Sequence, residues 1–168
     1  QDIVLEDINL HYMHGMGVVS QFSKNIHINN FKGEPRKESG RTIAAFADFL
    51  HFSGCYGKIT VENSLFSGSH DDDINVHGTH LRVMESNGNK IKVRFMHEQT
   101  WNLDAFEKGD SIAFVDNKTL LAYGNAIVKS VEKISKRELQ LELDRPAPRG
   151  VKENHCVENL TKTPEVVI

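Results

Sequence analysis

The sequence has 168 residues, of which 39% are hydrophobic and 26% are charged. This length suits one well-buried domain, or one domain that carries a small second one. The formal net charge of −3 shows no basic excess, which argues against nucleic acid as a partner, and no apolar run approaches the length of a membrane span. The two cysteines, Cys55 and Cys156, are too few for a disulfide framework; a bridge between them is an option, but two reduced thiols are favoured.

The first half of the chain repeats itself. Short runs rich in Ile, Val and Phe, separated by Gly, Asn, Ser and Asp, predict an all-β protein. One template (aliphatic, any residue, aliphatic, polar, Asn or Asp) occurs at 3–7, 26–30 and 59–63. If residues 32–41 are a loop insertion, a second set of runs aligns at 18–20, 50–52 and 74–76. A period in the low twenties without a Leu/Asn ladder predicts coils of a right-handed parallel β-helix.

The stretch 69–80 (SHDDDINVHGTH) is the densest group of chemically active side chains, with three consecutive carboxylates and three histidines. Asp48 begins its segment as Asp72 begins the next, 24 residues later, which is about one coil. Equivalent positions in successive coils stack about 4.8 Å apart. We therefore expect Asp48 beside Asp72, with Asp71 next to it, and His51 near Asn75.

Several other side chains are candidate substrate-binding groups. They are His70, His51, His77, Asn75 and Trp101. Each histidine is also well explained as a structural hydrogen-bonding residue. Trp101 suits the apolar face of a sugar ring, and its alternative is a place in the core of a barrel. A transition-metal site at His77 and His80 with an Asp is a weaker hypothesis.

From Met84 the pattern changes to several short strand-like runs with turn signals between them. The runs lie at 90–96, 110–115, 119–123, 126–131 and 139–143, with one of the turn signals at Gly124-Asn125. This spacing predicts a small antiparallel β-barrel-like module inserted at 84–148, between β-helix coils at 1–83 and a return to the β-helix at 149–168. Residues 163–168 resemble the opening strand of another coil, and no capping repeat is visible, so the chain looks truncated at both ends.

The acidic segments carry a family resemblance. At Asp48, at His70-Asp71-Asp72 and at Ile74-Asn75-Val76-His77-Gly78-Thr79 the sequence resembles glycoside hydrolase family 110, the bacterial α-1,3-galactosidases. The likeness extends to the strand at 57–63 and to Gly109-Asp110. One departure is Asp73, which stands where a small residue is expected.

The resemblance implies a β-helix with an inserted barrel in a secreted or periplasmic enzyme. That enzyme would remove terminal α-1,3-linked galactose, as in blood-group B or linear Gal-α-1,3-Gal structures, with inversion and with no cofactor or metal. Its substrate partner is then an oligosaccharide or glycoconjugate. The catalytic residues implied are Asp48, Asp71 and Asp72.

Inverting hydrolysis needs one protonated carboxyl and one carboxylate, roughly 6.5–9.5 Å apart. Crowding of the acids favours keeping one of them protonated, and side chains that diverge from neighbouring coils would give the separation. We expect Asp71 and Asp72 to include the base that activates water, with Asp48 as the acid or a second base.

Two alternatives remain at this point. A polygalacturonase-like β-helix hydrolase would need basic residues around the acids, and Lys58 is the one basic residue between 48 and 80. A non-catalytic carbohydrate- or Ca²⁺-binding solenoid would use the acidic run for oxygen ligands. The sequence leaves open the preference for linear or branched substrates, the oligomeric state and whether this stretch is active alone.

Overall fold

In the computed structural model, residues 2–168 are described, and Gln1, where the first predicted region begins, lies outside them. The chain divides into two compact units. One runs to Gly78 and resumes at Thr163–Ile168, and the other is Thr79–Lys162. The predicted insertion, 84–148, is therefore too short at both ends, because strands at Leu81–Asn87 and Cys156–Asn159 pair within the second unit. No helix among residues 2–168 has the length and apolarity to cross a membrane.

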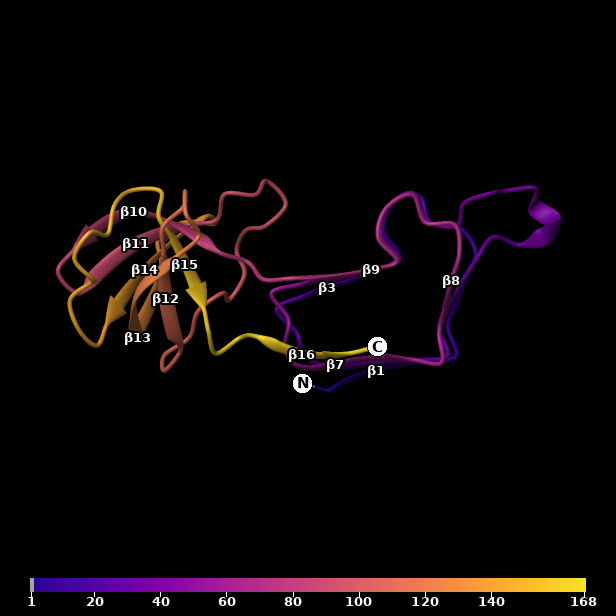
Figure 1. Ribbon diagram of the computed structural model, residues 1–168, viewed down its shortest axis with the longest axis horizontal. Coiled ribbons are helices and arrows are strands. Elements are labelled where there is room, and N and C mark those ends of the chain that lie inside the picture. Colours follow the sequence, from indigo (N-terminus) through magenta and orange to yellow (C-terminus); the bar gives the residue numbers. More distant parts are fainter. Residues whose placement is uncertain (1) are drawn as a thin grey trace. The chain divides into compact units, whose positions relative to one another are not determined.

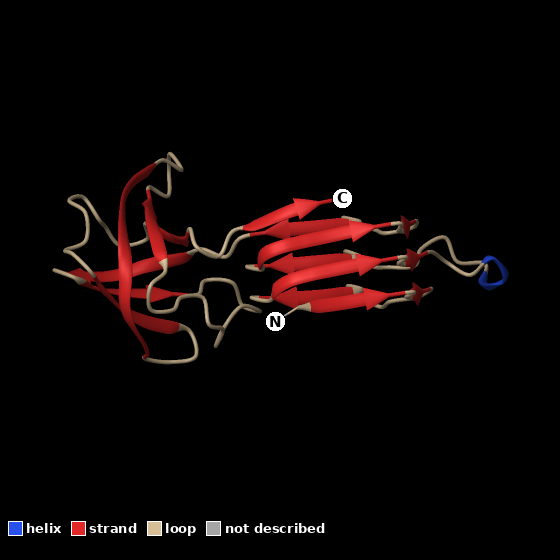
Figure 2. Ribbon diagram, turned by 90° about the horizontal axis from the view of Figure 1, so that it is seen from below, coloured by secondary structure: helices blue, strands red, loops and turns tan. Residues whose placement is uncertain are grey.

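The first unit, called here the stacked-strand unit, consists of parallel strands (Figures 1 and 2). Its sheets have the orders β1-β4-β7-β16, β2-β5-β8 and β3-β6-β9. The chain thus visits the three sheets in turn three times, each visit being called here a coil, and β16 adds a further strand to the first sheet. The strands are β1 (Ile3–Glu6), β2 (Asn9–Leu10), β3 (Val18–Gln21), β4 (Lys24–Asn29), β5 (Lys32–Gly33), β6 (Leu50–Ser53), β7 (Tyr56–Glu62), β8 (Leu65–Phe66), β9 (Ile74–His77) and β16 (Pro164–Val167).

The register of these strands confirms the predicted repeat. Ile3 pairs with Ile26 and Ile26 with Ile59, as the template requires. The second set aligns as predicted, because β3 pairs with β6 and β6 with β9 in parallel register. The tail also behaves as an opening strand, since β16 pairs with β7. The insertion begins later than predicted, because Lys32 and Gly33 stay in the ladder as β5; the loop beyond carries a short 3₁₀ helix, Lys37–Ser39 (Figure 1).

The Asn or Asp that ends each template copy explains how the chain turns its corner. Asp7, Asn30 and Asn63 all have a positive φ, between 52° and 56°. Asn and Asp tolerate this left-handed conformation better than other residues with a Cβ. Their side chains also link coils, because Asn30 Nδ2 donates to Asp7 Oδ1 at 2.7 Å and Asn63 Nδ2 donates to Asn29 Oδ1 at 2.9 Å. The same residue type therefore provides both the bend and a bond between coils.

The inside of the stacked-strand unit is apolar. In β4 the alternation of the strand buries Ile26 and Ile28 while their neighbours face outward. Phe66 packs with its ring centroid 5.5 Å from that of Phe31 and 5.6 Å from that of Phe49. A Cβ at Gly33 would lie 2.5 Å from the Phe49 ring, so glycine at this position makes room for the core.

The second unit is an antiparallel β-barrel. Its pairing order is β10-β11-β14-β13-β12-β15, and β15 pairs again with β10 over two positions. Within the predicted runs 90–96 and 110–115, Ile91, Val93 and Phe95 are buried, as are Ile112 and Phe114. The strands are β10 (Leu81–Asn87), β11 (Lys90–Arg94), β12 (Ser111–Val115), β13 (Ala122–Lys133), β14 (Glu138–Leu143) and β15 (Cys156–Asn159).

One predicted turn is wrong. Residues 119–123 and 126–131 were expected to be separate runs around Gly124-Asn125, but Ala122–Lys133 is a single strand, β13. Gly124 is absent from the residues with positive φ. A Cβ at this position would lie 2.3 Å from Pro148 Cγ. Glycine is thus present because Pro148 packs against the strand and not because the chain turns.

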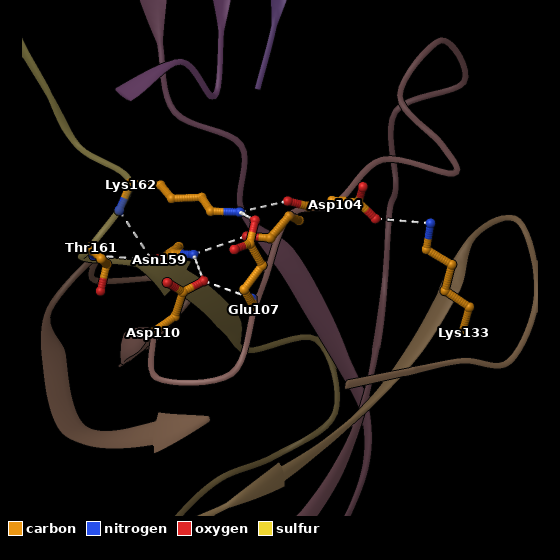
Figure 3. Close-up of polar contacts among 8 residues, drawn as sticks. Asp104, Glu107, Asp110, Lys133, Asn159, Thr161 and Lys162 are labelled. Carbon is orange, nitrogen blue, oxygen red and sulfur yellow. Dashed lines mark hydrogen bonds and ion pairs between the residues drawn. The ribbon is translucent and has the colours of Figure 1, made fainter. Parts of the chain in front are cut away.

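A buried acid organises one end of the barrel unit (Figure 3). Asp110 is 5% exposed, and its Oδ2 accepts hydrogen bonds from the Glu107 backbone N–H at 2.7 Å and from Asn159 Nδ2 at 2.6 Å. Asn159 Oδ1 in turn accepts the backbone N–H groups of Thr161 and Lys162. These contacts tie β12 and β15 to the segment that leaves the unit, which gives Gly109-Asp110 a structural role.

Candidate active site

The repeat brings Asp48 and Asp72 to equivalent places in neighbouring coils. Leu50 pairs with Ile74, and the Phe49 backbone N–H donates to the Asp72 carbonyl at 3.1 Å. Asp48 and Asp72 lie two residues before Leu50 and Ile74, so the same register makes the two aspartates neighbours. The spacing of 24 residues predicted this neighbour relation correctly.

The three predicted acids do come together. One carboxylate oxygen from each of Asp48, Asp71 and Asp72 lies within 4.8 Å of the other two. Asp48 is buried, at 3% exposure, whereas Asp71 and Asp72 are exposed. Asp73 points elsewhere, since its Oδ1 accepts the Ser69 hydroxyl at 2.7 Å. Carboxylates at this spacing can hold a proton, a water molecule or a cation between them.

The expected divergence of the acids is not what the structure shows. Oxygens within 4.8 Å of one another are closer than the roughly 6.5–9.5 Å between the carboxyls of inverting glycosidases. The reason is that neighbouring coils place equivalent residues one strand spacing apart. The carboxylates of Asp48, Asp71 and Asp72 also point toward one another and not apart. The spacing of the three carboxyl groups alone therefore does not select inversion.

Two predicted histidines form a chain of contacts with the buried acid. His51 Nδ1 lies 2.6 Å from Asp48 Oδ2, and its Nε2 lies 3.2 Å from His77 Nε2. His77 Nδ1 lies 2.8 Å from the Gly78 carbonyl oxygen. Asn75 is the register partner of His51, as predicted. Both ring nitrogens of each histidine are thus engaged within the site.

His70 is placed next to a residue that the sequence analysis missed. Its ring centroid lies 5.5 Å from that of Phe46, which is 62% exposed. Phe46 precedes Asp48 by two residues, and His70 directly precedes Asp71. The signal was available in the repeat: Ala45 bridges Ser69 in parallel, so Phe46 aligns with His70 at the same spacing of 24.

Trp101 belongs to the other unit and is not in a barrel core. Its side chain is 43% exposed, and Lys136 Nζ lies 5.2 Å from the ring centroid. The core interpretation of Trp101 is therefore wrong, whereas its contact with a sugar stays a prediction.

The histidine metal hypothesis gains no support from the described residues. Among residues 2–168, the group of possible ligand atoms is the aspartate cluster and includes neither His77 nor His80. His77 uses both ring nitrogens in the contacts above. Burial, followed by the nearby Arg82, lowers the pKa of His80 and so favours the neutral imidazole. The position of His80, and not its pKa, therefore leaves it out of the ligand group. Cys55 and Cys156 are both free and buried, so the option of a bridge between them is not realised.

The chain is similar to known proteins along its whole length. Residues 90–157 match the family described as GLAA-B beta-barrel domain II. Alpha-1,3-galactosidase A of Bacteroides thetaiotaomicron is 48% identical over 169 residues, which cover 99% of this chain and 30% of that protein. The proteins of the same name from Akkermansia muciniphila (47% over 169 residues) and Bacteroides fragilis (45% over 170 residues) are each matched by the whole chain over 28% of their length. The chain thus spans somewhat more than a quarter of these relatives.

Proposed function

We propose that the chain, which is 45–48% identical to part of several proteins named alpha-1,3-galactosidase A, is the catalytic part of a longer glycoside hydrolase that removes terminal α-1,3-linked galactose from glycans. The observation that carries the proposal is the convergence of Asp48, Asp71 and Asp72 from two coils onto one place. Two or more carboxyl groups at a sugar site are the chemical requirement of glycoside hydrolysis.

The cluster can divide the chemistry among its members. One carboxylate takes a proton from water as the water oxygen bonds to the anomeric carbon, and one protonated carboxyl gives its proton to the departing glycosidic oxygen as that carbon–oxygen bond breaks. The products are galactose and the shortened glycan, and the two carboxyls exchange protonation states.

Phe46 supports a sugar as the ligand. An exposed aromatic ring beside the acids suits the apolar C–H face of a pyranose. The substrate proposed is an oligosaccharide or glycoconjugate that ends in α-galactose. We also propose that the stacked strands are part of a right-handed parallel β-helix and that the protein is secreted or periplasmic.

The deciding experiment is galactose release from a Gal-α-1,3-Gal disaccharide by the full-length protein, with proton NMR of the first-formed anomer. Early β-galactose is expected and indicates inversion; early α-galactose would instead fit the close spacing of the carboxyls. Asp72→Asn should abolish release, whereas Asp73→Asn, a neighbouring acid bonded to Ser69, should leave it intact. No release by the wild type would overturn the proposal.

A binding solenoid is the second candidate, and the aspartate cluster is the observation that favours it, because Ca²⁺ prefers carboxylate oxygens. It predicts a rise in melting temperature with Ca²⁺ that Asp72→Asn removes. The hydrolase proposal predicts galactose release that persists in excess EDTA. The polygalacturonase-like alternative is weaker still, since Lys58, the one basic residue between 48 and 80, lies 3.6 Å from Glu165.

A further inference from the structure

The contacts from Asp48 to Gly78 form an unbroken line of three polar pairs. They join Asp48 Oδ2 to His51 Nδ1 (2.6 Å), His51 Nε2 to His77 Nε2 (3.2 Å) and His77 Nδ1 to the Gly78 carbonyl oxygen (2.8 Å). The two imidazole rings meet edge to face, with centroids 5.0 Å apart and planes at 71°. All three distances are within the range of hydrogen bonds.

The protons of this line can be counted. A carbonyl oxygen only accepts, so His77 Nδ1 carries a hydrogen. The pair of Nε2 atoms needs a second hydrogen, because two bare nitrogens would face each other with their lone pairs. The pair of His51 and Asp48 needs a third. Two neutral imidazoles supply only two hydrogens, so the line holds one proton more than neutral histidines and a carboxylate provide.

The short contact between Asp48 and His51 places the extra proton. At 2.6 Å it has the length of a charge-assisted hydrogen bond, which joins a carboxylate to a positively charged imidazole pair. The positions that flank the pair in the strand register are uncharged: Val19 and Asn75 beside His51, and Ser53 beside His77. The line ends at Asp48, which lies within 4.8 Å of a carboxylate oxygen of both Asp71 and Asp72.

We propose that His51 and His77 share one proton, and that this positive charge holds Asp48 as the carboxylate that receives the proton of the attacking water. His51 and His77 are positioning residues in this scheme, since they act through Asp48. The inference rests on the proposed hydrolase function and deepens it, because it assigns Asp48 to the base and leaves the acid to Asp71 or Asp72.

The test separates the charge from the hydrogen bonds. In His77→Gln the amide N–H can still donate to His51 Nε2, so His51 stays neutral and keeps its bond to Asp48, but the shared proton is lost. We expect kcat to fall on the order of tenfold with KM little changed, because water activation loses part of its driving force. His27→Gln is the matched control, since His27 bonds to Glu62 on another sheet of the same unit.

The leaving group distinguishes base from acid. With α-galactosyl fluoride, whose departure needs little help from an acid, the loss in His77→Gln should persist if Asp48 is the base. A loss that disappears with the fluoride would make Asp48 the acid and overturn the assignment. Full activity of His77→Gln on both substrates would also overturn it.

Nitrogen-15 NMR of the full-length protein labelled at histidine detects the shared proton through the chemical shifts of the ring nitrogens. The Nε2 signals of His51 and His77 should lie between those of bare and protonated nitrogens, and His77→Gln should return His51 to a neutral ring. Two neutral rings in the wild type would refute the shared proton. This reading needs no turnover, so it stands even if the wild type releases no galactose and the hydrolase proposal itself fails.

Discussion

At the scale of single residues, Phe46 is an exposed part of the proposed sugar site. A flat ring contacts the C–H groups of a pyranose, and a branched aliphatic chain of similar volume does so less well. Phe46→Tyr should therefore keep KM for the disaccharide near the wild-type value, whereas Phe46→Leu should raise it about tenfold with a small change in kcat. The matched control is Leu65→Ala, another exposed apolar side chain of the unit. Equal KM values for the Tyr and Leu variants would contradict a stacking role.

The residues of the site differ in how well the sequence predicted them. Asp48 and Asp72 were predictable because the strand register converts a spacing of one coil into a contact. Phe46 obeys the same spacing relative to His70 but lies in a bend before β6, outside the strand-like runs that reveal the repeat. The line from His51 to His77 was not predictable either, since strand register alone does not determine side-chain rotamers.

At the scale of elements, the corner residues of the coils make a prediction about stability. Asn30 combines a φ of 52° with a hydrogen bond to Asp7. Asn30→Gly loses the bond but keeps the backbone conformation, whereas Asn30→Ala also pays about 1–2 kcal/mol for the left-handed region. Urea unfolding should therefore rank the wild type above Gly and Gly above Ala. An Ala variant as stable as the Gly variant would show that the corner relaxes to another conformation.

Gly124 gives a second prediction at this scale. An added methyl group would lie 2.3 Å from Pro148 Cγ and 2.7 Å from its Cβ, and the ring of proline cannot turn away. Gly124→Ala should destabilise the barrel unit by about 1–3 kcal/mol, as other overpacked sites do. Pro148→Ala should recover much of that loss in the double variant, which a double-mutant cycle measures. Additive losses would show that the two residues do not contact.

Gly124 and Pro148 also show why the sequence did not predict strand β13 as one element. A Gly-Asn dipeptide is a strong turn signal in sequence, yet in β13 the glycine accommodates a residue that is distant in the chain. Local sequence propensity carries no information about such a contact between residues that are distant in the chain. The repeat in the stacked-strand unit was easier to predict, because its contacts recur at one fixed spacing.

At the scale of the whole molecule, the boundaries of the two units follow pairing and not the change of sequence pattern. The pattern changes near Met84, but β10 begins at Leu81, and β15 at Cys156–Asn159 completes the barrel beyond the predicted end at 148. β15 follows a stretch without strands and carries little alternation of its own, so the sequence offered no signal for it. The chain forms a strand there because it pairs with β10 and β12.

These boundaries predict that residues 79–162 fold alone. Each barrel strand has two neighbours within the unit, and the inward side chains of β11, β12 and β14 are buried. At the end where the chain leaves the unit, Asp110 accepts hydrogen bonds from the Glu107 N–H and from Asn159. The excised segment should give dispersed amide signals in NMR and one cooperative thermal transition. Asp110→Ala should lower that transition, because Asn159 and the Glu107 N–H lose a charged acceptor, at a cost of about 1–3 kcal/mol. The shorter segment 84–148 lacks β15 and part of β10, so it should remain unfolded. Folding of 84–148 with the stability of 79–162 would mean that β15 is dispensable and that the boundary drawn from strand pairing is wrong.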